Sequence, residues 1–100
     1  MRATIKSLKD DKAFDIVTIS LSSKTTFADY MVVVSGRSGR HVNAIANNLL
    51  MNLKSIGWKK IIKEGTEGSG WVLIDAGDIL IHIFRPQIRD FYKLEKIWAY

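Results

Sequence analysis

The strongest constraint on the fold is a hairpin pattern in residues 71–84, WVLIDAGDILIHIF. Two runs rich in β-branched residues flank a short link made of Ala76 and Gly77. β-Branched residues in alternation are typical of strands, and glycine accepts the positive φ angle that a tight turn requires. The pattern therefore predicts two antiparallel strands joined by a two-residue loop.

A two-residue loop also determines which residues lie opposite one another and which share a face. Asp75 is expected to pair with Asp78, and Trp71 with His82. One face of the hairpin is wholly β-branched and is predicted to form the core, with Val72, Ile74, Ile79, Ile81 and Ile83. The other face mixes aromatic, aliphatic and acidic side chains, namely Trp71, Leu73, Asp75, Asp78, Leu80, His82 and Phe84.

This second face is an unusual surface to present to water alone. Two opposed aspartates repel each other, and a tryptophan beside a histidine exposes apolar area. An unpaired buried imidazole is costly, so His82 either has a hydrogen-bond partner within the protein or faces a binding partner. The neighbouring Trp71 favours a partner-binding surface. The alternative is a face covered by the chain's own termini, with His82 bonded to a backbone carbonyl.

Hydrophobic periodicity predicts the remaining strands and a first helix. Residues 15–22 alternate with period two, and residues 29–36 are apolar on both sides, which is typical of an inner strand. A further strand is expected at 58–65 and a short helix within 1–12. The resulting α-β-β-α-β-β-β-α order predicts an α/β (α+β) fold, in which helices pack against a mixed five-stranded sheet.

A long helix is predicted to begin at Ser38 and to end at Gly57, a favourable C-terminal residue. Its apolar face is predicted to contain Val42, Ile45, Ala46, Leu49, Leu53 and Ile56. The side chains predicted to face away from the core are Asn43, Asn47, Asn48 and Asn52.

A last helix is predicted over residues 86–98, because proline is favoured at a first helical position. Phe91, Leu94 and Trp98 form its core stripe, and Tyr92 lies outside that stripe. Tyrosine, arginine and tryptophan are frequent binding hot spots. A tyrosine ring resting on an arginine stem explains Tyr92 equally well.

Composition sets the class of protein. One hundred residues with 47% hydrophobic content suit a single domain, 1–100, that needs no covalent cross-links. The absence of cysteine excludes disulfides, thiolate nucleophiles and cysteine metal sites. A net charge of +5 favours acidic partners, nucleic acid first among them. No apolar run approaches the ~18 residues of a membrane span and no secretory signal is present, so a cytoplasmic protein is expected.

The chemistry of an enzyme finds little support in the sequence. The segment SGRSGRH at 35–41 joins a strand to a helix but matches neither GxxxxGK[ST] nor GxGxxG. Arg40 and His41 in a first helical turn oppose the helix dipole, which favours either an external anion or simple solvation. Asp75 and Asp78 lack the third nearby carboxylate that a magnesium-dependent transferase would want. We therefore expect no catalytic residue, cofactor or metal.

Three segments together resemble the ribosomal silencing factor family, RsfS, also called Iojap-like or YbeB: ADYMVVVSGRSGRHVNAIANNL, GWVLIDAGDILIHIF and RDFYKLEKIW. The resemblance implies a nucleotidyltransferase-like single domain without catalysis. It implies binding to the fourteenth protein of the large ribosomal subunit, at the intersubunit face. Bound there, a family member blocks association with the small subunit and represses translation when nutrients are limiting. A role in large-subunit assembly is also implied.

The resemblance also implies where the partner binds. The expected partner-binding residues are Trp71, Asp75, Ala76, Asp78, His82, Arg89, Tyr92 and Lys96. A secondary contact with ribosomal RNA or an acidic patch is expected at Arg37, Arg40 and His41, and a homodimer of the free protein is expected too. The alternatives are a nucleotidyltransferase-type nucleotide-binding enzyme and an RNA-binding module.

Overall fold

The structure is a computed structural model, and it describes residues 2–21, 29–65 and 70–87. The elements are α1 (Arg2–Asp10), β1 (Phe14–Ser20), β2 (Tyr30–Ser35), α2 (Gly39–Ser55), β3 (Ile62–Glu64), β4 (Trp71–Asp75) and β5 (Ile79–Phe84). This order confirms the predicted succession of elements up to β5. The helix predicted over 86–98 lies outside the described residues, except for its first two positions, Pro86 and Gln87, which are helical.

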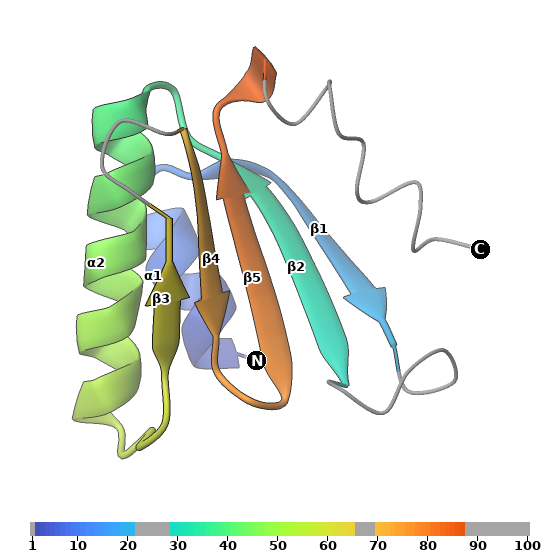
Figure 1. Ribbon diagram of the computed structural model, residues 1–100, viewed down its shortest axis with the longest axis vertical. Coiled ribbons are helices and arrows are strands. Elements are labelled where there is room, and N and C mark those ends of the chain that lie inside the picture. Colours follow the sequence, from blue (N-terminus) through green and yellow to red (C-terminus); the bar gives the residue numbers. More distant parts are fainter. Residues whose placement is uncertain (1, 22–28, 66–69, 88–100) are drawn as a thin grey trace.

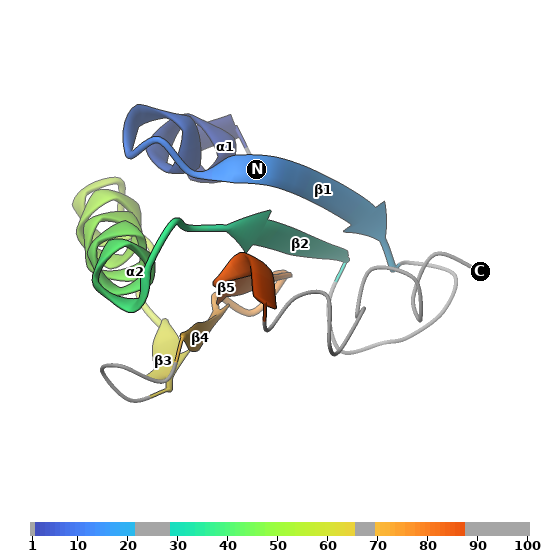
Figure 2. The ribbon, with the colours of Figure 1, turned by 90° about the horizontal axis from the view of Figure 1, so that it is seen from above.

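The five strands form one mixed sheet in the order β1-β2-β5-β4-β3. The central pair, β2 and β5, is parallel, and the other three pairs are antiparallel. Both helices lie on the same side of the sheet, as Figures 1 and 2 show. The prediction of a mixed five-stranded sheet with helices packed against it is confirmed. A nucleotidyltransferase-like fold remains a prediction.

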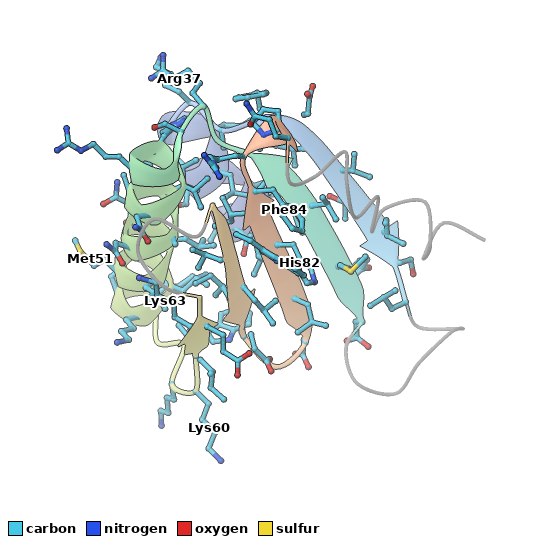
Figure 3. All side chains as sticks on the ribbon, turned by 45° about the horizontal axis from the view of Figure 1, so that its top comes forward. Arg37, Met51, Lys60, Lys63, His82 and Phe84 are labelled. Atoms are coloured by element: carbon cyan, nitrogen blue, oxygen red, sulfur yellow. The ribbon has the colours of Figure 1, made fainter. Side chains whose placement is uncertain are left out.

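The main core lies between the sheet and the helices. The five β-branched residues of the hairpin predicted to form the core are all at most 3% exposed, and they pack against Leu8 of α1 and the apolar stripe of α2. Burying one such side chain contributes about 1.5–3 kcal/mol. The opposite face of the sheet has a second buried cluster, made of Ile19, Leu21, Met31, Val33 and Phe84. Figure 3 labels Phe84, which is fully buried.

Helix α2 begins directly after Ser38, the predicted start, which is its N-cap: the Ser38 hydroxyl accepts a hydrogen bond from the His41 backbone N–H. Five of the six residues of its predicted apolar face are buried. The prediction is wrong for Ile56, which is 59% exposed because it is the C-cap, where the backbone leaves the helical path. Gly57 follows with φ +97°, the left-handed conformation expected of a glycine that ends a helix.

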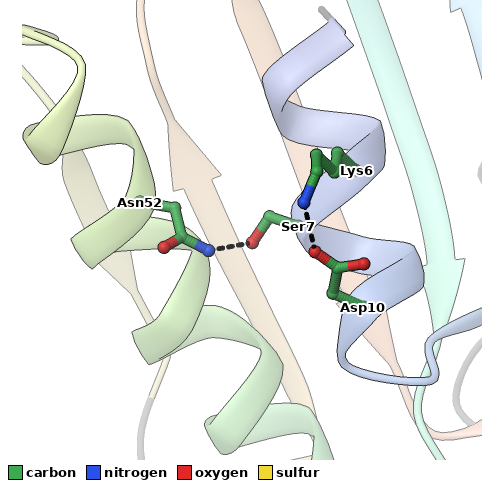
Figure 4. Close-up of polar contacts among 4 residues, drawn as sticks. All are labelled: Lys6, Ser7, Asp10 and Asn52. Carbon is green, nitrogen blue, oxygen red and sulfur yellow. Dashed lines mark hydrogen bonds and ion pairs between the residues drawn. The ribbon is translucent and has the colours of Figure 1, made fainter.

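Two of the asparagines predicted to face away from the core make hydrogen bonds to α1 and to the residue that follows it. The Asn48 side-chain amide donates to the Asp11 carboxylate at 3.0 Å, and the Asn52 amide donates to the Ser7 hydroxyl at 2.8 Å. Figure 4 shows the second of these bonds between the two helices. Periodicity within α2 could not reveal this contact, because α1 packs beside the helix and not beneath its apolar stripe.

Two predicted strands differ from those in the structure. The strand expected at 15–22 is β1, which begins at Phe14 and contains an irregularity between Phe14 and Val17, where Asp15 has φ +51°. The strand expected at 58–65 contracts to β3, because Trp58 turns inward before it. The Trp58 indole N–H donates to the Ala76 carbonyl at 2.7 Å, and its ring packs against the main core.

Candidate partner-binding face

The hairpin that presents the predicted site has a different register from the one expected. Asp75 pairs with Leu80, and Trp71 pairs with Phe84. The predicted pairing of Trp71 with His82 is wrong by two residues, because the turn lies one residue later than predicted. The Ala76 N–H donates to the Ile79 carbonyl at 3.0 Å, so residues 77 and 78, and not 76 and 77, form the two-residue turn. A slip of two residues leaves every side chain on its predicted face.

The two aspartates are not opposed, which removes the predicted repulsion between them. The Asp75 carboxylate accepts a hydrogen bond from the Gly77 backbone N–H at 2.9 Å and so supports its own turn. Gly77 has the positive φ expected there, +84°. The Asp78 carbonyl accepts hydrogen bonds from the backbone N–H groups of Asp29 and Tyr30, which ties the turn to the start of β2.

On the sheet face opposite the helices, side chains are exposed near β3 and buried near β2. One row of side chains across this face runs Ile62, Asp75, Leu80, Met31, from β3 to β2. Ile62 is 57% exposed, the next two are half-buried, and Met31 is 2% exposed. The β3–β5 part of this face is therefore accessible. We call it the hairpin face, and it consists of Ile62, Glu64, Trp71, Leu73, Asp75, Leu80 and His82.

His82 is held by an aromatic cluster. The Trp71 indole N–H donates to His82 Nδ1 at 3.2 Å. The Phe84 ring is stacked on the imidazole, with 5.8 Å between centroids and 5° between planes, and it lies 4.9 Å from the Trp71 ring. Figure 3 shows His82 and Phe84 on the same strand. The hydrogen-bond partner of His82 is thus a side chain of the hairpin face and not the backbone carbonyl of the alternative reading.

Burial lowers the pKa of His82 from 6.5 to about 4, so the imidazole is neutral at neutral pH. Because Nδ1 accepts the indole hydrogen, the single ring proton is carried by Nε2. The hairpin face therefore offers a partner one neutral donor, at His82 Nε2, beside half-buried apolar side chains. Asp75 adds a carboxylate at the edge of the same surface.

The basic turn at 37–41 holds two helices together. His41 Nδ1 accepts from the Arg37 backbone N–H at 2.8 Å, and Nε2 lies 2.7 Å from the Asp11 carbonyl oxygen, to which it donates. Both ring nitrogens are thus engaged within the chain. Arg37 and Arg40 are exposed, and Figure 3 shows Arg37 projecting from this end of the molecule. Any contact with an anion at this turn falls to the two guanidinium groups.

The predicted site residues divide into three groups. Trp71, Asp75 and His82 lie together on the hairpin face, and Asp78 is exposed in the adjoining turn. The side chain of Ala76 is 4% exposed and packs in the main core, so it positions the turn. The residues that lie outside the described part of the chain are Arg89, Tyr92 and Lys96.

Sequence reasoning did not assign a binding role to three apolar residues of the hairpin face. Alternation in the sequence already places Leu73 and Leu80 on this face, so a signal that could have identified them was present. Ile62 could not be found in this way, because its position depends on β3 pairing with β4. Among the described residues, Leu73 and Ile62 belong to neither buried cluster; Ile62 is exposed and Leu73 is partly exposed.

The described residues contain no group of three or more histidine, cysteine, aspartate or glutamate side chains able to hold a metal ion. Within the same part of the chain, no helix is both long enough and apolar enough to cross a membrane.

Comparison with known proteins finds one family along the whole chain. A family model described as "Ribosomal silencing factor during starvation" matches residues 1–100. The ribosomal silencing factor RsfS of Zymomonas mobilis is 46% identical over 100 residues, which are all of this chain and 75% of the relative. A mouse protein named for mitochondrial assembly of the ribosomal large subunit is 31% identical over 98 residues, covering 95% of this chain and 43% of its own length. A crystal structure from Chromobacterium violaceum, 39% identical, superposes with a TM-score of 0.92 over 97% of this chain and 81% of its own.

Proposed function

The chain belongs to the ribosomal silencing factor family, as its motifs predict, and we propose that it binds the large ribosomal subunit through the hairpin face. The observation that carries the proposal is the accessible apolar and aromatic surface on β3, β4 and β5, beside the neutral Trp71–His82 pair. Apolar anchors next to a few well-oriented polar groups are typical of protein–protein interfaces.

The proposed partner is the fourteenth protein of the large subunit, at its intersubunit face. The hairpin face is suited to a protein surface because it combines apolar side chains with two carboxylates, Glu64 and Asp75, and its aromatic side chains are already held in place. Trp71 is fixed by its hydrogen bond to His82 and by the Phe84 ring, so little side-chain freedom is lost when the partner binds. Once bound, the domain blocks association of the two subunits, because it occupies the surface of the large subunit on which the small subunit docks.

We propose a regulatory and not a catalytic role. Asp75, one of the two carboxylates that a metal-dependent transferase would use, is engaged with the backbone of its own turn. The 37–41 turn lacks a phosphate-loop motif, and its histidine holds α1 to α2. These observations favour a protein that acts by occupying a surface. The name of the mouse relative supports a related role in large-subunit assembly.

Subunit joining tests the proposed function. Purified large and small subunits are mixed, and their association is followed by light scattering with and without the protein. Preincubation of the large subunit should slow or prevent joining, whereas preincubation of the small subunit should have no effect beyond dilution. Joining at an unchanged rate, at protein concentrations that saturate the large subunit, would contradict the blocking mechanism while leaving the binding proposal standing.

A further inference from the structure

The positive charge of this protein is concentrated in one segment. Residues 30–63 contain six lysines or arginines and no aspartate or glutamate, whereas the rest of the chain contains nine and ten. The net charge of +5 therefore originates in this segment. It comprises β2, which is an inner strand, then α2, the first two residues of β3 and the links between them. The charge must consequently be displayed by α2, by its two ends and by β3.

Four of the six charges gather where α2 ends and β3 begins. Lys54 is in the last turn of α2, Lys59 and Lys60 are in the link, and Lys63 is on β3, all of them exposed. The Lys63 ammonium donates to the Asn47 side chain at 3.0 Å and so bridges β3 to α2. Figure 3 shows Lys60, Lys63 and Met51 on the same side of the molecule.

We call this surface the basic face, and its residues are Met51, Lys54, Lys59, Lys60 and Lys63. No carboxylate of the described residues neutralises it. Among the described residues, the ion pair is between Lys6 and Asp10, which are both on α1. Glu64 follows Lys63 on β3 and therefore points to the other side of the sheet. The negative end of the α2 dipole stabilises the charge of Lys54, which is in the last turn, but not the charges of the other three lysines. Lys59 and Lys60 follow the helix and stabilise no element, so the fold does not require them.

We propose that the basic face binds the phosphate backbone of RNA, as a second surface separate from the hairpin face. Exposed lysines without acidic neighbours attract a polyanion, and each phosphate contact releases counterions. An anionic membrane is a poorer match, because a membrane-surface helix exposes an apolar face, and the apolar stripe of α2 is buried in the core. The proposal rests on the charge distribution and does not depend on the hairpin face binding a protein.

The two surfaces lie on different sides of the sheet. Lys63 is on the helix side of β3, whereas Ile62 and Glu64 are on the hairpin face. One molecule can therefore contact a protein with one side and RNA with the other. For a protein of the ribosomal silencing factor family, such an arrangement would add affinity and fix orientation on the large subunit.

Fluorescence anisotropy with a labelled RNA duplex of about 20 base pairs tests the proposal. The wild-type protein should bind with an affinity that falls steeply between about 50 and 200 mM salt. Lys59→Gln with Lys60→Gln should weaken binding about tenfold or more and reduce the slope of log affinity against log salt by about 2, which is one for each lost contact. Thermal melts of this variant should match the wild type, because neither side chain makes a contact that the fold needs.

The matched control removes the same charge from the far end of α1, with Lys9→Gln and Lys12→Gln. That end packs near the N-terminal half of α2, away from the basic face. The control should bind RNA nearly as well as wild type. Equal losses in the two double variants would show that net charge alone drives binding and would overturn the proposal.

Binding of the wild type to vesicles and binding of a hairpin-face variant to the duplex complete the test. Absence of salt-dependent RNA binding by the wild type, or tighter binding to vesicles containing phosphatidylserine than to the duplex, would overturn the assignment to RNA. Leu73→Asp on the hairpin face should leave duplex binding unchanged. A Leu73→Asp protein that loses subunit binding but keeps duplex binding would show that the two surfaces act separately. Either proposal can then fail without the other.

Discussion

Lowering the pH below 6.5 should destabilise this protein through one side chain, His82. In the unfolded chain the imidazole binds a proton near its ordinary pKa of about 6.5. In the folded protein burial lowers that pKa to about 4, and protonation would also place a hydrogen on Nδ1, where the Trp71 indole now donates. The unfolded state therefore binds more protons between these two values, and stability falls as the pH falls from 6.5 to 4.

The size of the effect follows from the lowered pKa. One pKa unit corresponds to about 1.4 kcal/mol, so the full difference is on the order of 3 kcal/mol. His82 is only partly buried, and solvent near the ring reduces the value, so we expect a loss of about 2 kcal/mol. Above pH 7 the contribution is constant, because the imidazole is neutral in both states. Below pH 4 it is again constant, because the imidazole is protonated in both.

Urea unfolding at a series of pH values from 7.5 to about 4 measures this loss. The carboxylates also titrate in this range, so the quantity of interest is the difference between wild type and His82→Phe. The free energy of unfolding of the wild type should fall by about 2 kcal/mol more than that of the variant. If wild type and His82→Phe lost equal stability, the imidazole would not be buried as described.

Three other substitutions test the packing and the turn. Ile81→Ala should destabilise the fold by about 2–5 kcal/mol, because it leaves a cavity in the main core, and urea unfolding would show it; a loss below about 1 kcal/mol would contradict the core assignment. Gly77→Ala should cost about 1 kcal/mol in the same assay, since nothing crowds the added methyl group and only the positive φ opposes it; an unchanged midpoint would mean that the turn relaxes. Trp71→Ala should weaken large-subunit binding by about 2 kcal/mol or more in a titration; wild-type affinity would exclude Trp71 as an anchor.

Local patterns in the sequence were sufficient for much of this fold. Alternation assigned the two faces of the hairpin correctly even though the register was wrong, because side chains repeat with period two and the slip was two residues. The register itself follows from a turn at residues 77 and 78, which the hydrogen bond from the Gly77 N–H to the Asp75 carboxylate supports. The helical periodicity that starts at Ser38 and the glycine at 57 marked the ends of α2, because both signals are local.

Contacts between distant segments could not be predicted in this way. His41 looked like an anion ligand, because the carbonyl that it binds belongs to Asp11, thirty residues earlier in the chain. The contact of Asn52 with Ser7 was not predicted for the same reason, although Asn52 is exposed as expected. The accessible position of Ile62 likewise depends on strand pairing that no local pattern encodes.

Cosedimentation of Leu73→Asp with separated ribosomal subunits tests the central claim most directly. Leu73 is partly exposed on the hairpin face and belongs to neither buried cluster, so a carboxylate there should leave the fold intact and disrupt an apolar interface. Lys9→Gln is the control, because it changes the net charge equally on the exposed side of α1. We expect wild type and Lys9→Gln to sediment with the large subunit and not with the small one, and a folded Leu73→Asp protein to remain at the top of the gradient. Cosedimentation of Leu73→Asp at the wild-type level would contradict the claim that the hairpin face binds the large subunit.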